Sequence, residues 1–206
     1  MNILQELFES PIKVRALKLF LRNPTEVFSV EEGSRRLGAS RKEFGRQVKK
    51  FSAIGLVRSR SVRRMISRGK GKPRLLTDMV FFANSSFLLY RELRELVLNA
   101  SPTAWEEKLD ALKRCGRIKL AVIAGALVND PKGRVDMFIV GDKIKTRPLA
   151  AFVRSVEADV GTRLRYAALT PEEFVYRYGM YDNFIRDMLE RPHKKIINKM
   201  KKVFGD

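Results

Sequence analysis

Cationic side chains are concentrated in one segment of this chain. Between Arg41 and Arg74 the sequence has thirteen Lys or Arg residues and a single acid, Glu43, within 34 residues. Side chains of this kind neutralise phosphates, and arginine can bind one through two parallel N–H donors. The segment therefore predicts binding to a polyanion. The candidate contact residues are Ser40, Arg41, Lys42, Arg46, Lys49, Arg58, Arg60, Arg63, Arg64, Arg68, Lys70, Lys72 and Arg74.

The remaining reactive residue types do not form a catalytic set. Cys115 is the single cysteine, which excludes an internal disulfide and a cysteine metal cluster. His193 is the single histidine and has no second metal-binding residue beside it. Asp136 stands near Arg134, and a fixed cation there would repel a metal ion. We expect Asp136 to form half of a salt bridge with its neighbour, and we expect no metal and no cofactor.

Composition sets the class of protein. The chain has 206 residues, 45% of them apolar, and 42 Lys or Arg against 23 Asp or Glu, a formal net charge of +19. This apolar content can fill one large or two small cores, which argues against general disorder. The longest apolar run, Leu120 to Val128, has nine residues, whereas a membrane-spanning helix needs about 20. With no export signal at the N-terminus, we expect a cytoplasmic protein.

The charge is unevenly distributed along the chain. Up to Asp78 there are 19 basic and 7 acidic residues, and after it 23 basic and 16 acidic. A polyanionic partner could be nucleic acid or an acidic membrane surface. Membrane binding requires a long basic amphipathic helix, whereas here the cations are split between a helix and a hairpin. Nucleic acid is therefore the favoured partner, with no membrane contact.

Helix-starting and helix-ending residues in the first half of the chain predict three helices. One begins at Pro11 and stops before Asn23-Pro24, and a second begins at Ser29, where Glu32 completes a capping box, and ends at Leu37-Gly38. The third begins at Ser40 with a second capping box to Glu43. Its buried face is predicted to contain Phe44, Val48 and Phe51, with Lys42, Arg46 and Lys49 opposite.

A β-hairpin is predicted to follow these helices. Apolar and arginine positions alternate loosely from Leu56 to Ile66, the glycine-rich segment 67–73 reads as the tip, and the pattern resumes at Arg74. Helix, helix, helix and hairpin resemble the winged helix-turn-helix domains of ArsR-like regulators. The resemblance rests on Phe28-Ser29-Val30, Arg36 to Ser40, Val48 to Phe51 and Ile54 to Val57. Gly33-Ser34 departs from it, because such domains usually have a large apolar residue and alanine there.

Two helices are expected between the halves of the chain. The apolar segment from Phe81 to Leu98 predicts a helix, which either packs on its own domain or pairs with a second copy in a homodimer. Residues 99–103 read as a turn or linker, and Trp105 to Arg114 predicts a further helix.

The second half predicts an α/β domain. Strands are expected over Ile118 to Ala124, Val135 to Val140 and Leu164 to Leu169, with a helix over Pro148 to Val160. The strand ending at Gly125 and the run Val135 to Asp142 resemble the minimal nucleotidyltransferase domain of the polymerase-β-like superfamily. Beyond it, the apolar stripe from Tyr176 to Leu189 is predicted to pack in the core, and the lysine-rich end from Lys194 is predicted to be helical.

The resemblance implies a site that has lost its chemistry. That family uses a Gly-Ser turn for nucleotide phosphates and paired strand carboxylates for Mg²⁺. Here the turn reads Gly125-Ala126, and the carboxylate positions read Arg134 and Asp136. Gly125 and Asp136 are therefore predicted to be vestigial, and the chain is predicted not to be an enzyme.

The sequence thus predicts an α+β protein of two domains. A winged helix-turn-helix domain spans 1–80, connecting helices span 81–115, and a nucleotidyltransferase-like α/β domain with a small mixed sheet spans 116–206. The predicted function is transcriptional regulation by binding double-stranded DNA, with the second domain serving a nucleotide-like effector, dimerisation or bracing. The alternatives are an active nucleotidyltransferase acting on RNA or protein, and an RNA-binding module.

Overall fold

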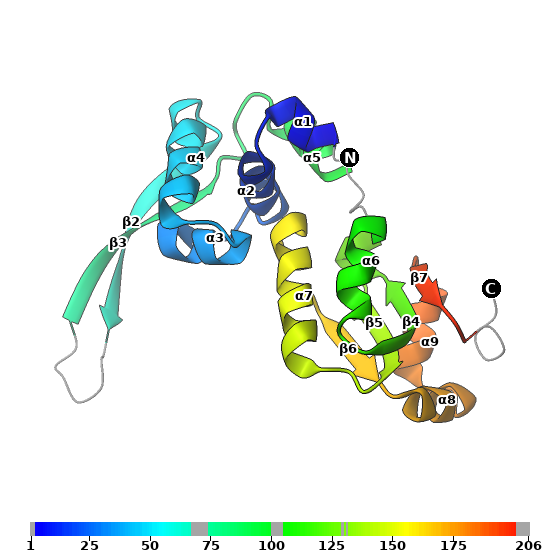
Figure 1. Cartoon of the computed structure of the whole chain (residues 1–206). Helices are drawn as coiled ribbons and strands as arrows, with labels where there is room; N and C mark the ends of the chain where they lie inside the picture. The colour runs from blue at the N-terminus through cyan, green and yellow to red at the C-terminus, as the bar shows by residue number, and fades with distance from the viewer. Residues whose placement is uncertain (1–2, 67–73, 100–104, 129, 131, 201–206) are drawn as a thin grey trace. The chain divides into compact units, whose positions relative to one another are not determined.

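The chain folds into two compact units. The computed structural model describes residues 3–66, 74–99, 105–128, 130 and 132–200, which form an α+β protein with about nine α-helices and two small sheets (Figure 1). Unit 1 comprises Met1–Thr103 and Glu157–Thr162, and unit 2 comprises Ala104–Val156 and Arg163–Asp206.

Unit 1 contains five helices and a three-stranded antiparallel sheet in its described part. Its sheet has the strand order β1-β3-β2, so the long strand β2 forms one edge. The elements are α1 (Ile3–Phe8), α2 (Pro11–Arg22), β1 (Phe28–Ser29), α3 (Val30–Leu37), α4 (Arg41–Ala53), β2 (Val57–Ile66), β3 (Arg74–Ala83) and α5 (Tyr90–Asn99).

Serine residues start the three helices that the sequence predicts in unit 1. The hydroxyl oxygens of Ser10, Ser29 and Ser40 each accept a hydrogen bond from a backbone N–H in the first turn of α2, α3 and α4. The capping box is complete at Ser40 and Glu43, but at Ser29 the structure has the serine half alone, because Glu32 pairs with Arg36. The predicted starts are therefore confirmed, and one capping box is not.

An aromatic cluster forms the core of unit 1. The ring of Phe20 on α2 lies 5.7, 6.2 and 6.5 Å, centroid to centroid, from the rings of Phe28, Phe44 and Phe51. A Cβ added to Gly33 would collide with the ring of Phe44. The Phe44 ring therefore fills the space that a larger side chain at position 33 would take. This packing explains why a glycine stands where the winged-helix pattern has a larger residue.

The hairpin is longer than the sequence predicts. Strand β3 continues to Ala83, so Phe81 and Phe82 belong to the sheet and not to the helix expected over 81–98. That helix, α5, begins at Tyr90. The prediction failed because a continuous apolar run fits a buried strand as well as a helix, and pairing with β2 over ten residues decides between them.

Unit 2 contains a four-stranded mixed sheet. The strand order is β6-β5-β4-β7, with β5 and β6 parallel and the other pairs antiparallel. The elements are α6 (Trp105–Lys113), β4 (Arg117–Ile123), the 3₁₀ helix η1 (Gly125–Val128), β5 (Met137–Asp142), α7 (Thr146–Val160), β6 (Tyr166–Leu169), α8 (Pro171–Gly179), α9 (Asn183–Glu190) and β7 (Lys194–Asn198). The last residues of α7 belong to unit 1.

The core of unit 2 forms where α8 and α9 pack on the sheet. Phe138 of β5 lies against the rings of Phe174 and Phe184, and Ile185 and Met188 complete this cluster. Of the three tyrosines expected in the same core, Tyr178 stacks on the Phe174 ring at 5.8 Å, but the other two do not join it: Tyr176 is 69% exposed and Tyr181 is 82% exposed. The prediction was wrong because the stripe is interrupted at Met180 and Tyr181, where α8 ends, so the residues of α8 and α9 do not share one face.

The C-terminal segment is a strand instead of the predicted helix. Residues Lys194–Asn198 form β7, which pairs antiparallel with β4. Alternation of lysine and isoleucine is weak in this short segment, and a sheet edge distant in sequence supplies the hydrogen bonds that stabilise the extended form. Residues 201–206 of the predicted helix lie outside the described residues. Across the described chain, no helix combines the length and apolar character needed to cross a membrane.

Candidate nucleic-acid interface

A tight connection sets the position of α4 relative to α3. Gly38 ends α3 in the left-handed conformation (φ +61°), and its N–H and that of Ala39 bond back to carbonyls of α3. Ser40 then caps α4: its hydroxyl accepts from the Glu43 N–H at 3.2 Å, and its own N–H donates to the Glu43 carboxylate at 3.0 Å. Three residues, 38–40, thus separate two defined helix ends, and the predicted role of Ser40 as helix cap is confirmed.

The outer face of α4 is cationic. Phe44, Gln47, Val48 and Phe51 are buried, whereas Lys42, Arg46 and Lys49 are exposed at spacings of four and three residues, so these three side chains share one side of the helix. Within the part of the chain that the structure describes, none of these three cations forms an ion pair with a carboxylate. They are therefore available to an anionic partner.

Arg41 differs from its neighbours. Its guanidinium Nη2 lies 2.6 Å from the Glu31 carboxylate of α3, and both side chains are exposed. Glu43 lies in the same first turn, and hydrogen bonds from the Ser40 hydroxyl and backbone N–H hold the pKa of its carboxyl below the usual value, with the nearby Arg46 acting in the same direction. Arg41 is thus tied to α3, whereas Lys42, Arg46 and Lys49 are not tied.

The hairpin presents arginines on both of its faces. Arg58 and Arg60 are exposed on one face of β2, opposite Phe82 and Val80 of β3, and Arg63 is exposed on the other face. The guanidinium carbon of Arg60 lies 5.8 Å from the centroid of the Phe82 ring, a cation–π contact. A nucleic acid that touches one face of the hairpin would therefore meet Arg58 and Arg60 together.

The structure does not describe the side chains of five predicted contact residues. Arg64 lies in β2 and Arg74 in β3, paired through the ladder with Leu76 and Ile66. Arg68, Lys70 and Lys72 lie outside the described residues. The prediction for these five positions remains a prediction.

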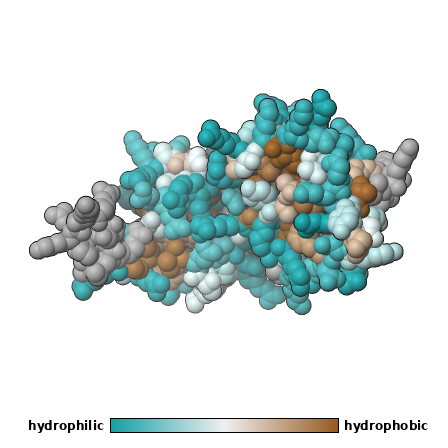
Figure 2. All heavy atoms as spheres, turned by 90° about the horizontal axis from the view of Figure 1, so that it is seen from below, coloured by the Kyte–Doolittle hydropathy of each residue, from teal (hydrophilic) through white to brown (hydrophobic). Residues whose placement is uncertain are grey.

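Two residues near this interface were missed at the sequence level. Lys50 is exposed on α4 next to Lys49, and its place on the helical wheel could have revealed it. Phe82 supports Arg60, and it could not have been found without the strand register, because the sequence assigns it to a helix. In the space-filling view, hydrophilic residues cover most of the visible surface, with smaller hydrophobic patches between them (Figure 2).

Both carboxylate oxygens of Asp136 in unit 2 accept hydrogen bonds from within the unit. Its side chain is 1% exposed. Oδ1 accepts from the Ala126 N–H at 2.8 Å, and Oδ2 accepts from the Arg165 N–H at 2.8 Å. The Arg165 guanidinium adds two contacts of 3.2 Å, one to each oxygen. The expected salt bridge is therefore present, but its partner is Arg165, because the Arg134 side chain is exposed and lies 3.9 Å from Asp187.

Gly125 makes room for this carboxylate. Its φ is +51°, and an added Cβ would collide with Oδ1 of Asp136. The Ala126 N–H at the start of η1 therefore donates to an internal carboxylate. In the described residues no group of three or more His, Cys, Asp or Glu side chains is placed to hold a metal ion.

Comparison of the chain with protein-family models, curated proteins and solved structures finds no match.

Proposed function

We propose that the protein regulates transcription by binding double-stranded DNA through unit 1, acting as a winged helix-turn-helix domain. The observation that carries this proposal is the cationic face of α4, where Lys42, Arg46 and Lys49 are exposed and form no ion pair with a carboxylate of the described residues. A helix of this width fits the major groove, and its capped N-terminus adds backbone N–H groups that favour phosphate.

The hairpin supplies the second contact in this proposal. Strand β2 is the edge of its sheet and carries Arg58, Arg60 and Arg63 on exposed positions. Arginines on a projecting hairpin can clamp the phosphate backbone beside the groove that a recognition helix occupies. Because β2 follows α4 after a short turn at Gly55, the two cationic elements are adjacent in one unit.

Duplex DNA is favoured over single-stranded RNA by the part of the hairpin between Arg58 and Arg74. That part has no aromatic side chain, whereas Phe81 and Phe82 lie near the end of β3, where the Phe82 ring contacts Arg60. Single-stranded nucleic acids are usually held by base stacking on aromatic rings. If single-stranded RNA binds as tightly as duplex DNA, the protein is instead an RNA-binding module.

Unit 2 is proposed to be a nucleotidyltransferase-like domain without catalytic activity. Its support is the state of Asp136, whose two oxygens are occupied by Ala126 and Arg165, leaving little capacity to bind Mg²⁺. Its proposed roles are effector binding, bracing of unit 1 or oligomerisation. An Mg²⁺-dependent transfer of nucleotides by the purified protein, lost in Asp136→Ala, would contradict this part of the proposal.

The recognition face is tested by removing two of its cations. Arg46→Ala/Lys49→Ala should weaken binding to a preferred duplex from a genomic fragment pool by about tenfold or more, and should lower the salt dependence of binding by nearly two counterions. The measurement is a fluorescence-anisotropy titration at two salt concentrations, with single-stranded RNA and random duplex as competitors.

A charge-matched control separates recognition from general attraction. Lys145→Ala/Arg147→Ala removes two exposed cations from unit 2 and should leave affinity for the preferred duplex within about twofold. If both double variants weaken binding equally, the cations of α4 have no special role and the proposal fails.

A further inference from the structure

Exposed cations gather where two turns of unit 2 meet. Arg117 begins β4 directly after the turn that follows α6, and it pairs across the ladder with Asp142, the residue before Lys143. Lys145 and Arg147 follow at the start of α7. The side chains of Arg117, Lys143, Lys145 and Arg147 are all exposed, and these four residues are named the turn cluster below.

Backbone contacts hold the two turns together. The Lys145 N–H donates to the Cys115 carbonyl at 2.7 Å. A Cβ added to Gly116 would lie 3.0 Å from the Lys143 carbonyl oxygen, so the close approach of the two backbones requires glycine there. The fold itself therefore brings together cations from two segments of the chain.

No carboxylate of the described chain forms an ion pair with the turn cluster. Two acids on the elements that these turns connect are already paired: Asp142 of β5 with Lys119 at 3.0 Å, and Asp110 of α6 with Lys113 at 3.0 Å. Like charges brought together repel one another. An anion bound among the four cations would remove this repulsion.

Lys143 adopts a backbone conformation that favours glycine. Its φ is +51°, in the left-handed region, where the Cβ of any other residue is crowded by the backbone. The conformation of the turn therefore does not explain a lysine at this position, whereas a contact between its ammonium group and an anion would explain it.

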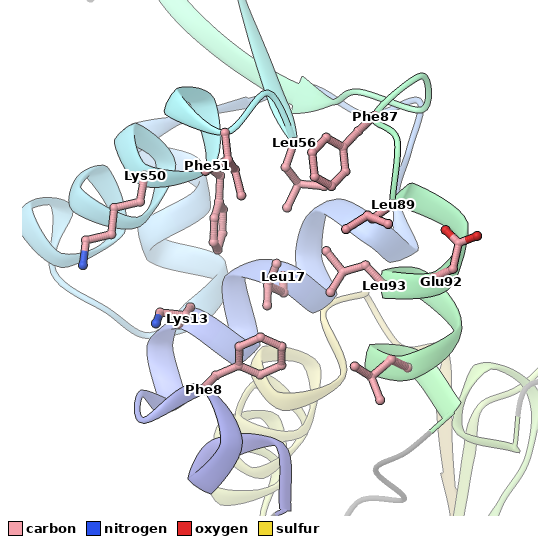
Figure 3. Close-up of a pocket in the computed structure, with 12 residues that line it drawn as sticks. Phe8, Lys13, Leu17, Lys50, Phe51, Leu56, Phe87, Leu89, Glu92 and Leu93 are labelled. Atoms are coloured by element: carbon pink, nitrogen blue, oxygen red, sulfur yellow. The ribbon is translucent and has the colours of Figure 1, made fainter.

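The apolar groove of unit 1 does not suit such an anion. It encloses about 550 Å³, and the side chains of Phe8 and Leu17 point into it (Figure 3). Lys13 and Lys50 lie on one side of this groove and Glu92 lies on the other. A phosphate there would lose its water to an apolar surface and would meet a carboxylate. These two lysines are therefore a suitable control.

We propose that the turn cluster binds a compact anion that carries several phosphate groups. Lysine and arginine both bind phosphate, and four of them on two adjoining turns can contact neighbouring phosphates at once. The ligand is either inorganic polyphosphate or the phosphate chain of a nucleotide. Because Asp110 and Asp142 lie on the same elements, the positive surface is short, which favours a compact anion over an extended nucleic acid.

This site is distinct from the vestigial one. Strand β4 runs from Arg117 to Ile123, so the turn cluster lies at the opposite end of the strand from Gly125. The inference deepens the effector role proposed for unit 2, and it does not rest on DNA binding by unit 1.

The test titrates the full chain with inorganic tripolyphosphate by isothermal titration calorimetry. Lys145→Ala/Arg147→Ala should weaken binding by about tenfold or more, because two of four cations are lost. Lys13→Ala/Lys50→Ala removes the same charge and should leave the affinity within about twofold. ATP and adenosine distinguish the two sources: ATP bound about tenfold more tightly than tripolyphosphate would identify a nucleotide, equal affinities would identify inorganic polyphosphate, and adenosine should not bind.

A second pair of measurements separates this site from the DNA interface. Arg46→Ala/Lys49→Ala should lose affinity for the preferred duplex and keep its affinity for tripolyphosphate, whereas Lys145→Ala/Arg147→Ala should do the reverse. A failure of DNA binding by the wild type would thus leave the tripolyphosphate result intact.

Lys143→Gly removes one cation and relieves the left-handed backbone at the same time. It should weaken tripolyphosphate binding by about threefold or more, while the free energy of unfolding in urea stays the same or rises. Loss of binding in this variant therefore could not be attributed to misfolding.

Four results would overturn the proposal. They are a wild type that does not bind tripolyphosphate in the millimolar range, equal weakening in all three double variants, a Lys143→Gly variant that binds as the wild type does, and adenosine that binds as tightly as ATP. Single-stranded RNA that binds about a hundredfold more tightly than tripolyphosphate, and loses this affinity in Lys145→Ala/Arg147→Ala, would also overturn it, because the turn cluster would then be an RNA contact.

Discussion

The two units use their charged residues in different ways. In unit 1, Lys42, Arg46 and Lys49 face solvent from one side of α4, and no carboxylate in the described part of the chain forms an ion pair with them. In unit 2, Arg165 is bound to Asp136, Arg191 to Asp187, and Lys119 to Asp142. A cationic excess by itself therefore does not locate an interface. In the described chain, exposed cations outside any ion pair occur in both units, Lys145 and Arg147 of unit 2 among them. Those of unit 1 lie close together in sequence on α4 and β2, and this clustering is why we propose the interface there.

The largest effect is expected from breaking the internal pair of unit 2. Asp136→Asn replaces a buried carboxylate that accepts from Ala126 and Arg165 with an amide that brings its own donors. We expect a loss of about 3 kcal/mol in the free energy of unfolding. Urea unfolding followed by the fluorescence of Trp105, the single tryptophan, which is buried in unit 2, measures this loss.

A surface ion pair of the same unit is the matched control. Asp142→Asn removes the partner of Lys119, 3.0 Å away and partly exposed, and should cost less than about 1 kcal/mol. Equal losses for Asp136→Asn and Asp142→Asn would show that Asp136 is not an internal structural group.

Two glycines with positive φ should differ in a similar way. Gly125→Ala would force a Cβ into the Asp136 carboxylate, whereas nothing lies within 4 Å of a Cβ at Gly38. We expect about 2 kcal/mol or more of destabilisation for Gly125→Ala, and about 1 kcal/mol for Gly38→Ala from backbone conformation alone. Urea unfolding, followed by Trp105 for the first and by circular dichroism for the second, measures both. A tolerated Gly125→Ala would contradict the observed packing.

The capping boxes of α4 and α8 allow the same substitution in each unit. Ser40→Ala and Thr170→Ala each remove a hydroxyl that accepts a first-turn N–H, and each should cost about 1 kcal/mol. Ser40→Ala should also weaken duplex binding, because it loosens the start of the proposed recognition helix, and Thr170→Ala should leave binding unchanged. Thermal unfolding and anisotropy titration of both variants make the comparison.

The smallest effect is a pH dependence of the α4 cap. The pKa of Glu43 is lowered in the folded chain, so its contribution to stability is present above the pKa of the unfolded chain and is lost as pH falls through the lower folded value. Glu43→Gln should therefore be less stable than the wild type at pH 7, and the difference should shrink as pH falls through the folded-state pKa. Urea unfolding at a series of pH values is the measurement. A difference that persists in acid would mean that the carboxylate is not the stabilising group.

The sequence predicted well those features of the fold that depend on neighbouring residues. The starts of α2, α3 and α4 depend on Ser10, Ser29 and Ser40, which bond within their own first turns. The mixed character of the second sheet also agrees with expectation. These features are set by neighbouring residues or by a strong alternation of strands and helices.

Features that depend on distant residues were not predicted. Strand β7 exists through its pairing with β4, and Asp136 finds its partner at Arg165, 29 positions away. Nearness in sequence pointed instead to Arg134. The candidate interface also combines local and distant features. The cationic face of α4 could be predicted from helical spacing. In contrast, the strand register of the hairpin was needed to place Arg58 and Arg60 on one face and Arg63 on the other, and to find the contact between Phe82 and Arg60.

The most direct test of the central claim is the specificity ratio of the unmodified protein. Equilibrium competition at physiological salt would compare its affinity for the best duplex selected from genomic fragments with its affinity for random duplex DNA. A regulator that reads sequence through α4 should prefer the selected duplex by about a thousandfold or more. A ratio near one, with all nucleic acids released together as salt rises, would contradict the account and leave unit 1 as a polyanion-binding domain without sequence preference.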